Sequence, residues 1–195
     1  MNKKRHNIVL IGGGSHCVSV IDIIENGNEF NILGILDSNP QEDNLLGYKI
    51  LGGDDLIPNL VSANVFFLIT IGQIKSSSIR KKINVILEEN NAKLATVISP
   101  LAYVSKYANI EEGTVVMNYA NVNAKSKIGK NCIVNTMANI EHNVLIGNFC
   151  HISTCAVING NSVVGGGTFI GSNATISNNI TIKENSLISA GSFIK

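Results

Sequence analysis

The sequence lacks a strong net charge, because its 15 basic and 14 acidic residues leave a formal charge of +1 at pH 7. A protein without a basic field attracts neither phosphate backbones nor acidic lipid surfaces as its main partners. No apolar run approaches the roughly 20 residues needed to span a bilayer, and the start leads into a short strand pattern instead of a signal-peptide core. These absences predict a cytoplasmic protein with no membrane span and no nucleic-acid partner.

The sequence also lacks the cysteine spacings of zinc ribbons and the cysteine framework of secreted domains. Its four cysteines are Cys17, Cys132, Cys150 and Cys155. Small buried thiols are the simplest interpretation, and no metal site is expected.

A strict six-residue repeat is the most informative feature of the chain. Sixteen successive positions spaced by six are Val or Ile: Val104, Ile110, Val116, Val122, Ile128, Val134, Ile140, Ile146, Ile152, Ile158, Val164, Ile170, Ile176, Ile182, Ile188 and Ile194. Four residues after each of these anchors the chain is mostly small, and three residues after it Gly or Asn is frequent, as at Gly113 and Asn131. Gly and Asn tolerate positive φ, so they predict a tight corner in each repeat. Short strands that share one aliphatic column in this way predict a parallel β solenoid.

The first ninety or so residues lack this period and alternate between expected strands and helices. Strands are expected over 7–11, 30–36 and 65–71, and a glycine turn at 12–14 leads into the first helix. Free backbone N–H groups at such a helix start suit phosphate, and Asp37 after the second strand could accept hydrogen bonds from a ribose or base. The dinucleotide fingerprint is incomplete because Cys17 stands at the third glycine position, so a purely structural turn remains an alternative.

The repeat resembles that of the hexapeptide-repeat acyltransferases, in which an aliphatic residue precedes a small one, as in Ile128-Gly129 and Ile146-Gly147. That resemblance implies triangular coils of three hexapeptides with left-handed crossovers. The resemblance then predicts two domains: a small α/β Rossmann-like nucleotide-sugar-binding domain over 1–99, and a left-handed parallel β-helix that binds acetyl-CoA over 100–195.

Nearly the whole chain resembles one branch of this family, the sialic-acid and bacillosamine-type sugar acetyltransferases. The first turn of that branch reads Gly-x-Gly-Gly-His, which Gly12, Gly14 and His16 match, whereas Ser15 departs from it. The motif after its third strand is Ile-Gly-Asn, matched by Ile71-Gly72 but with Gln73 in place of Asn. The Val97–Pro100 stretch is similar to the link between its two domains.

The resemblance implies an acetyl-CoA-dependent N-acetyltransferase acting on a nucleotide-linked amino sugar, a UDP-linked 4-amino sugar, in surface glycan biosynthesis. It assigns the nucleotide sugar to five residues: Gly12, Gly14, His16, Asp37 and Gly72. It assigns acetyl-CoA to three: Gly160, His151 and Ala190. It makes His142 the general base and adds three further catalytic candidates: Glu141, His151 and Asn135.

The chemistry agrees with a histidine, because attack on a thioester needs the lone pair of the amine and a neutral imidazole can accept the proton it loses. Many relatives carry an acidic residue directly after this histidine, whereas this chain has Asn143, which leaves Glu141 as a substitute. His142 and His151 lie two and five residues after anchors, so both are expected to point outward, on different faces of one prism.

Three outward apolar residues, Met137, Phe149 and Val157, predict a homotrimer. Acetyl-CoA would lie between neighbouring prisms, and His142 of one subunit could approach His151 of the next. Two alternatives remain open: an O-acetyltransferase of a sialic-acid-like sugar, and a non-catalytic trimer that binds a sugar nucleotide. Zinc hydration chemistry ranks low because it needs three imidazoles and the repeat holds two.

Overall fold

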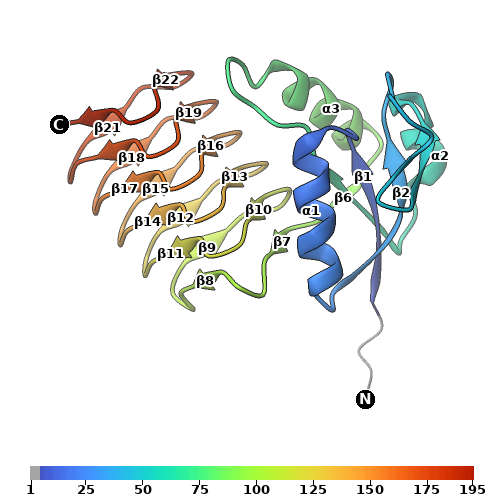
Figure 1. Cartoon of the computed structure of the whole chain (residues 1–195), viewed down its shortest axis with the longest axis horizontal. Helices are drawn as coiled ribbons and strands as arrows, with labels where there is room; N and C mark the ends of the chain where they lie inside the picture. Colours follow the sequence, from blue (N-terminus) through green and yellow to red (C-terminus); the bar gives the residue numbers. More distant parts are fainter. Residues whose placement is uncertain (1–4) are drawn as a thin grey trace. The chain divides into compact units, whose positions relative to one another are not determined.

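The structure is a computed structural model that describes residues 5–195 (Figure 1). Within that range no helix has the length and apolar character to cross a membrane. The chain forms two compact units. The first unit contains the chain up to Gly72 together with Ser78–Ala95, and the second contains Gln73–Ser77 together with Thr96–Lys195. The expected domain boundary after residue 99 stays a prediction, and residues 1–4 of the expected front domain lie outside the described residues.

The first unit is built on a mostly parallel six-stranded sheet with the strand order β3-β4-β2-β1-β5-β6. β1 pairs in parallel with β2 on one side and with β5 on the other, whereas β3 and β4 form an antiparallel pair. The strands are β1 (His6–Ile11), β2 (Phe30–Leu36), β3 (Asn44–Leu45), β4 (Tyr48–Gly52), β5 (Val65–Ile69) and β6 (Lys93–Leu94). The helices are α1 (Ser15–Asn26), α2 (Ile57–Leu60) and α3 (Ser78–Glu89), with a 3-10 turn η1 (Asp54–Leu56) before α2.

The predicted α/β order of this unit is confirmed. Helix α1 buries Cys17, Val20, Ile21 and Ile24, which recur at three- and four-residue steps and therefore share one face. The sequence did not predict the short β3–β4 pair or β6. Ligands of open parallel sheets bind at the carboxyl ends of the strands where the strand order reverses. In this sheet β1 lies between β2 and β5, so the carboxyl end of β1 is the expected site.

The third strand ends two residues earlier than predicted, because Thr70 turns its side chain back toward β1. The Thr70 hydroxyl donates to the carbonyl oxygens of Ile11 (3.0 Å) and Gly12 (2.7 Å). Arg80 on α3 is fully buried, and its guanidinium donates to the carbonyl oxygens of Ile69 (3.0 Å) and Ile71 (2.6 Å). These bonds hold the carboxyl ends of β1 and β5 in fixed positions.

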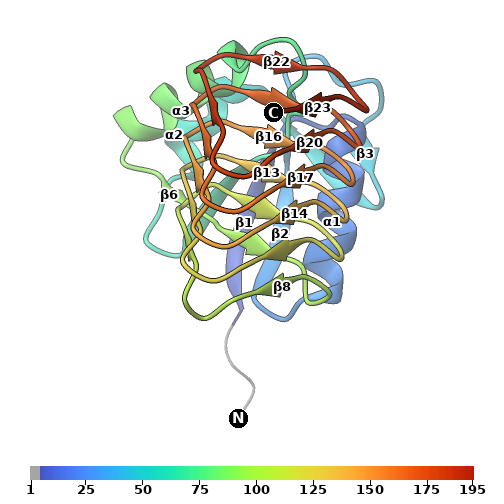
Figure 2. The same ribbon diagram turned by 90° about the vertical axis from the view of Figure 1, so that its left-hand side faces the viewer.

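The second unit is a left-handed parallel β-helix with three faces, whose coils follow one another from yellow-green to red in Figure 2. The first face holds β7 (Val97–Ile98), β10 (Val115–Val116), β13 (Ile133–Val134), β16 (His151–Ile152), β19 (Phe169–Ile170) and β22 (Leu187–Ile188). The second face holds β8 (Tyr103–Val104), β11 (Asn121–Val122), β14 (Asn139–Ile140), β17 (Val157–Ile158), β20 (Thr175–Ile176) and β23 (Phe193–Ile194). The third face holds β9 (Asn109–Ile110), β12 (Lys127–Ile128), β15 (Leu145–Ile146), β18 (Val163–Val164) and β21 (Thr181–Ile182).

The coil length is confirmed by the strand register, in which Val116 pairs with Val134 and Val134 with Ile152, a step of 18 residues. The repeat begins one step earlier than the sixteen anchors, because Ile98 pairs with Val116. Most anchors form one buried cluster with the small apolar residues that follow several of them by four, such as Ala138 and Cys150, as predicted.

A corner with positive φ follows the strands of the β-helix from Gly113 onward, as the Gly and Asn positions predicted. The same conformation occurs at Tyr119, Lys125, Met137, Phe149 and Cys155, which are neither Gly nor Asn. The left-handed backbone conformation costs a residue other than glycine roughly 1–2 kcal/mol of conformational free energy. From Lys125 onward, each corner offsets part of that cost with a hydrogen bond between coils, such as Met137 N–H to the Asn118 carbonyl at 3.0 Å.

Candidate functional site

A cavity of about 610 Å³ lies at the carboxyl ends of β1, β2 and β5 in the first unit. It is lined by all five residues assigned to the nucleotide sugar: Gly12, Gly14, His16, Asp37 and Gly72. Gly12 adopts φ +100°, and a Cβ at this position would overlap the Ile71 side chain. The turn therefore requires glycine at its first position, for both its conformation and its close approach to the end of β5.

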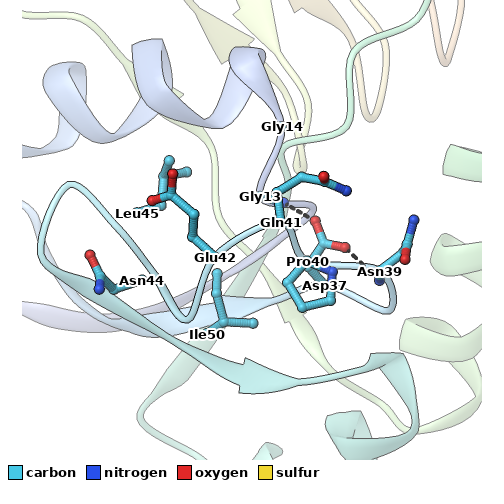
Figure 3. A pocket seen from close by; sticks show the side chains of 10 residues that line it. All are labelled: Gly13, Gly14, Asp37, Asn39, Pro40, Gln41, Glu42, Asn44, Leu45 and Ile50. Carbon is cyan, nitrogen blue, oxygen red and sulfur yellow. Dashed lines mark hydrogen bonds between the residues drawn. The ribbon is translucent and has the colours of Figure 1, made fainter.

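The carboxylate of Asp37 is hydrogen-bonded to the backbone of the glycine turn (Figure 3). Its Oδ2 accepts the Gly13 N–H at 2.7 Å, and its Oδ1 accepts the Asn39 N–H at 2.8 Å. The Gly13 N–H is thus paired within the protein and does not face a ligand, contrary to the expectation of a turn with free donors. No side chain caps the start of α1, which leaves that helix end available to attract a phosphate.

The lining of this cavity includes two carboxylates, those of Asp37 and Asp54. Burial raises the pKa of the Asp54 carboxyl, with the charge of Asp37 adding to the effect. Carboxylates accept hydrogen bonds from hydroxyl and N–H donors and repel phosphate oxygens. The cavity therefore combines a helix start suited to phosphate, at α1, with two carboxylates suited to a ribose or base, at Asp37 and Asp54.

The β-helix carries a buried polar cluster on its first face, at β16. His151 is only 7% exposed, and its ring packs edge-on against Phe169 at 5.2 Å between centroids. Its Nδ1 lies 2.5 Å from the Gln73 carbonyl oxygen, and its Nε2 lies 3.0 Å from the Asn135 amide nitrogen. His151 lies outside the aliphatic core, as expected, but the expectation of an exposed surface histidine is wrong, because the Gln73–Ser77 segment packs on it.

His142 lies on an exposed corner between β14 and β15, away from that cluster. Its Nδ1 lies 2.9 Å from the side-chain amide nitrogen of Asn143. Gly160 lies one coil further along the chain and is buried, and a Cβ there would come within 2.7 Å of His142 Cε1 and 2.8 Å of its Nε2. The imidazole therefore rests directly on the Gly160 backbone, in space that only glycine leaves open.

Glu141 precedes His142, but its carboxylate is hydrogen-bonded to two other side chains. It accepts the amide N–H groups of Asn123 at 2.9 Å and Asn139 at 3.0 Å. These two hydrogen bonds, Asn139 first, lower the pKa of the Glu141 carboxyl. The carboxylate is ionised and held in place by amides, so its influence on the neighbouring imidazole is electrostatic.

The predicted acetyl-transfer residues thus form two groups within one chain. Asn135 joins His151 on the first face, and Glu141 and Gly160 flank His142 at the corner after the second face. Ala190 is exposed in the last coil, apart from both groups. The sequence did not predict that His151 is held by Gln73. The step of 18 residues between His142 and Gly160 could have predicted their stacking.

Three of the four cysteines agree with the interpretation as small buried residues, since Cys17, Cys132 and Cys150 are buried, whereas Cys155 is half-buried at a corner of the β-helix. Burial raises the pKa of the Cys17 thiol to about 11, so it does not form a thiolate near neutral pH. Within residues 5–195, no three His, Cys, Asp or Glu side chains lie close enough together to hold a metal ion.

Comparison with known proteins covers both units. Residues 7–85 match the family model described as the PglD N-terminal domain. The acetyltransferase domain of PglB from Neisseria gonorrhoeae FA1090 is 30% identical, with a TM-score of 0.90 over 98% of this chain and 92% of that chain. Its structure in complex with acetyl coenzyme A is 29% identical, with a TM-score of 0.90 over 98% and 93% of the two chains.

A mutant of perosamine N-acetyltransferase from Caulobacter crescentus, in complex with CoA and GDP-perosamine, is 28% identical to the chain. Its TM-score is 0.90 over 97% of this chain and 88% of that chain. A comparison with curated protein sequences found no match.

Proposed function

The chain belongs to the hexapeptide-repeat sugar acetyltransferases, and we propose that it transfers the acetyl group of acetyl-CoA to the amino group of a nucleotide-linked sugar. The observation that carries this proposal is the structural similarity, over nearly the whole chain, to an N-acetyltransferase crystallised with CoA and a nucleotide sugar. The acceptor we expect is a UDP-linked 4-amino sugar used in surface glycan biosynthesis in the cytoplasm. Its nucleotide would occupy the cavity lined by Gly12, Asp37 and Gly72.

In this reaction a bond forms between the sugar nitrogen and the acetyl carbon, and the bond from that carbon to the CoA sulfur breaks. The attacking amine loses a proton, which the imidazole of His142 accepts as general base. His142 is suited to this role because it is exposed at a corner while its ring is held by Gly160 beneath it. Glu141 favours the imidazolium that forms, because its ionised carboxylate lies on the adjacent residue.

The test of this proposal is an acetyl-transfer assay with purified protein and acetyl-CoA. UDP-linked and GDP-linked 4-amino sugars should be offered separately, together with the matching hydroxy sugar, and the products identified by mass spectrometry. We expect an N-acetylated UDP sugar and release of free CoA thiol. Acetylation of the hydroxy sugar alone would identify an O-acetyltransferase, and nucleotide-sugar binding with no thiol release would identify a non-catalytic binding protein.

We propose that the protein works as a homotrimer, with acetyl-CoA bound between neighbouring prisms near Gly160. The support is a column of apolar side chains at one corner, spaced by one coil, which are exposed to solvent in a single chain. Leu101, Tyr119 and Met137 are 52%, 62% and 57% exposed. Light scattering should give a mass three times the 20.8 kDa of the chain, whereas a monomer at working concentration would contradict the proposal.

Replacing Asn143 by aspartate should raise the turnover number by about threefold through a better-oriented base. An amide can offer His142 Nδ1 either its oxygen or its nitrogen, so it permits both neutral tautomers of the ring. A carboxylate only accepts, so it holds the proton on Nδ1 and leaves Nε2 free to take a proton from the substrate. Asp tolerates the positive φ of 59° at this corner nearly as well as Asn.

The matched control for this variant is Asn179→Asp, at the same corner two coils further along, with φ 61°. It adds the same charge away from His142 and should leave the turnover number unchanged. A neighbouring carboxylate favours the protonated imidazole. The acidic limb of the pH–rate profile should therefore move to higher pH in Asn143→Asp but not in Asn179→Asp. A slower enzyme with an unmoved limb would mean that Asn143 does not act on the base.

A further inference from the structure

The hydrogen bonds around His151 determine where its ring proton lies. The Thr136 backbone N–H donates to Asn135 Oδ1 at 2.8 Å, so the other end of that amide, Nδ2, must face the histidine. Asn135 Nδ2 can only donate, so His151 Nε2, at 3.0 Å, must be the bare acceptor nitrogen. The proton is then on Nδ1, where it meets the Gln73 carbonyl oxygen at 2.5 Å.

Gln73 is held in the position that this chain of bonds requires. Its side chain is 3% exposed, and its amide nitrogen donates to the carbonyl oxygens of Phe149 at 2.8 Å and of Gly167 at 3.4 Å. Two carbonyl acceptors at one end define the orientation of this amide. The Gln73 side chain therefore anchors its own backbone carbonyl over His151, on the first face of the β-helix.

We propose that Gln73 is a positioning residue that holds His151 as the neutral Nδ1–H tautomer, so that His151 acts as a fixed acceptor for Asn135 and not as a proton carrier. Protonation of Nε2 would place two donors against each other, and the Asn135 amide cannot turn without losing the Thr136 N–H. With both ring nitrogens bonded inside its own chain, His151 is not free to orient His142 of a neighbouring subunit. The chain from Gln73 through His151 instead directs the Asn135 amide, and this functional part of the inference rests on the proposed acetyl transfer.

The tautomer can be measured directly by nitrogen NMR on the full-length protein labelled with ¹⁵N-histidine. The chain has only four histidines, so loss of one pair of signals in His151→Gln assigns that residue. At pH 7 we expect one His151 nitrogen to resonate as protonated Nδ1 and the other as bare Nε2. A proton on Nε2, or on both nitrogens, would overturn the inference whether or not the protein transfers acetyl groups.

The role of Gln73 is tested by Gln73→Glu, which keeps the size of the side chain but directs a carboxylate at two carbonyl oxygens. The segment should detach, and His151 should lose its single tautomer. The turnover number should fall about tenfold, with the KM for the nucleotide sugar within about threefold of its original value. Gln73→Leu, which removes the donors without adding charge, should behave in the same way. An unchanged His151 tautomer in both folded variants would show that Gln73 does not position it.

His151→Gln separates positioning from proton transfer. The glutamine oxygen can still accept the Asn135 N–H but cannot carry a proton near neutral pH. We expect it to retain at least about a tenth of the turnover number, and His151→Ala to retain far less. Equal and complete loss in both variants, with both folded, would make His151 a proton-transfer residue. A wild-type protein that transfers no acetyl group would contradict the proposed function and leave the tautomer result to decide this inference.

Discussion

Replacing His142 by alanine is expected to lower the turnover number at least about a hundredfold, since general-base assistance contributes about a hundred- to ten-thousandfold. The substitution should slow the chemical step and leave nucleotide binding unchanged, because His142 does not line the nucleotide cavity of the first unit. Alanine fits the corner, as Ala124 already occupies the same position one coil earlier. Single-turnover kinetics would measure the chemical step, and calorimetry would measure nucleotide-sugar binding.

The matched control for this variant is His6→Ala, which removes an exposed histidine from β1 in the first unit. It should leave acetyl transfer unchanged. If His142→Ala loses nucleotide-sugar affinity in proportion to its rate, the imidazole acts in binding and another residue takes the proton. If the rate falls less than tenfold in a folded protein, His142 is not the base.

Replacing Gly160 by alanine is expected to lower the turnover number about ten- to a hundredfold, because a ring displaced by about 1 Å can cost a hundredfold in rate. The added Cβ would come within 2.7 Å of His142 Cε1, so the ring must move. The backbone of Gly160 is not among the positions with positive φ, so alanine introduces no conformational strain there. The melting temperature should change little.

A double-variant cycle shows whether Gly160 acts through His142 or through acetyl-CoA. In a His142→Ala background there is no ring to displace, so Gly160→Ala should cause no further loss of rate. If Gly160→Ala raises the KM for acetyl-CoA by the same factor in both backgrounds, its main contact is with the co-substrate. That outcome would contradict the steric explanation while keeping Gly160 in the site.

The sequence predicted those parts of the structure that depend on residues close together in the chain. The anchors at six-residue steps define the coil and its buried column, and the corner three residues later follows from the tolerance of Gly and Asn for positive φ. Gly12 and Asp37 were placed at one cavity because carboxyl ends of parallel strands meet at one edge. That Asp37 binds the Gly13 N–H depends on how a loop folds back, which no local pattern encodes.

The environment of His151 was beyond prediction for a different reason. Its position in the repeat established only that the side chain points away from the aliphatic column. Its burial comes from Gln73, 78 residues earlier in the sequence, in a segment that lacks the period altogether. One signal was available, since Gln73 departs from the Asn of the resembled motif, but the departure alone did not indicate a contact.

The membership of Gln73–Ser77 in the second unit has a consequence for how this protein can be recombined with its relatives. A chimera joined after Ala95 would bring the donor's own residues at 73–77 to this β-helix, so Phe149, His151 and Gly167 would meet a foreign segment. Exchanging the front unit intact therefore requires two grafts, one ending at Gly72 and one running from Ser78 to Ala95.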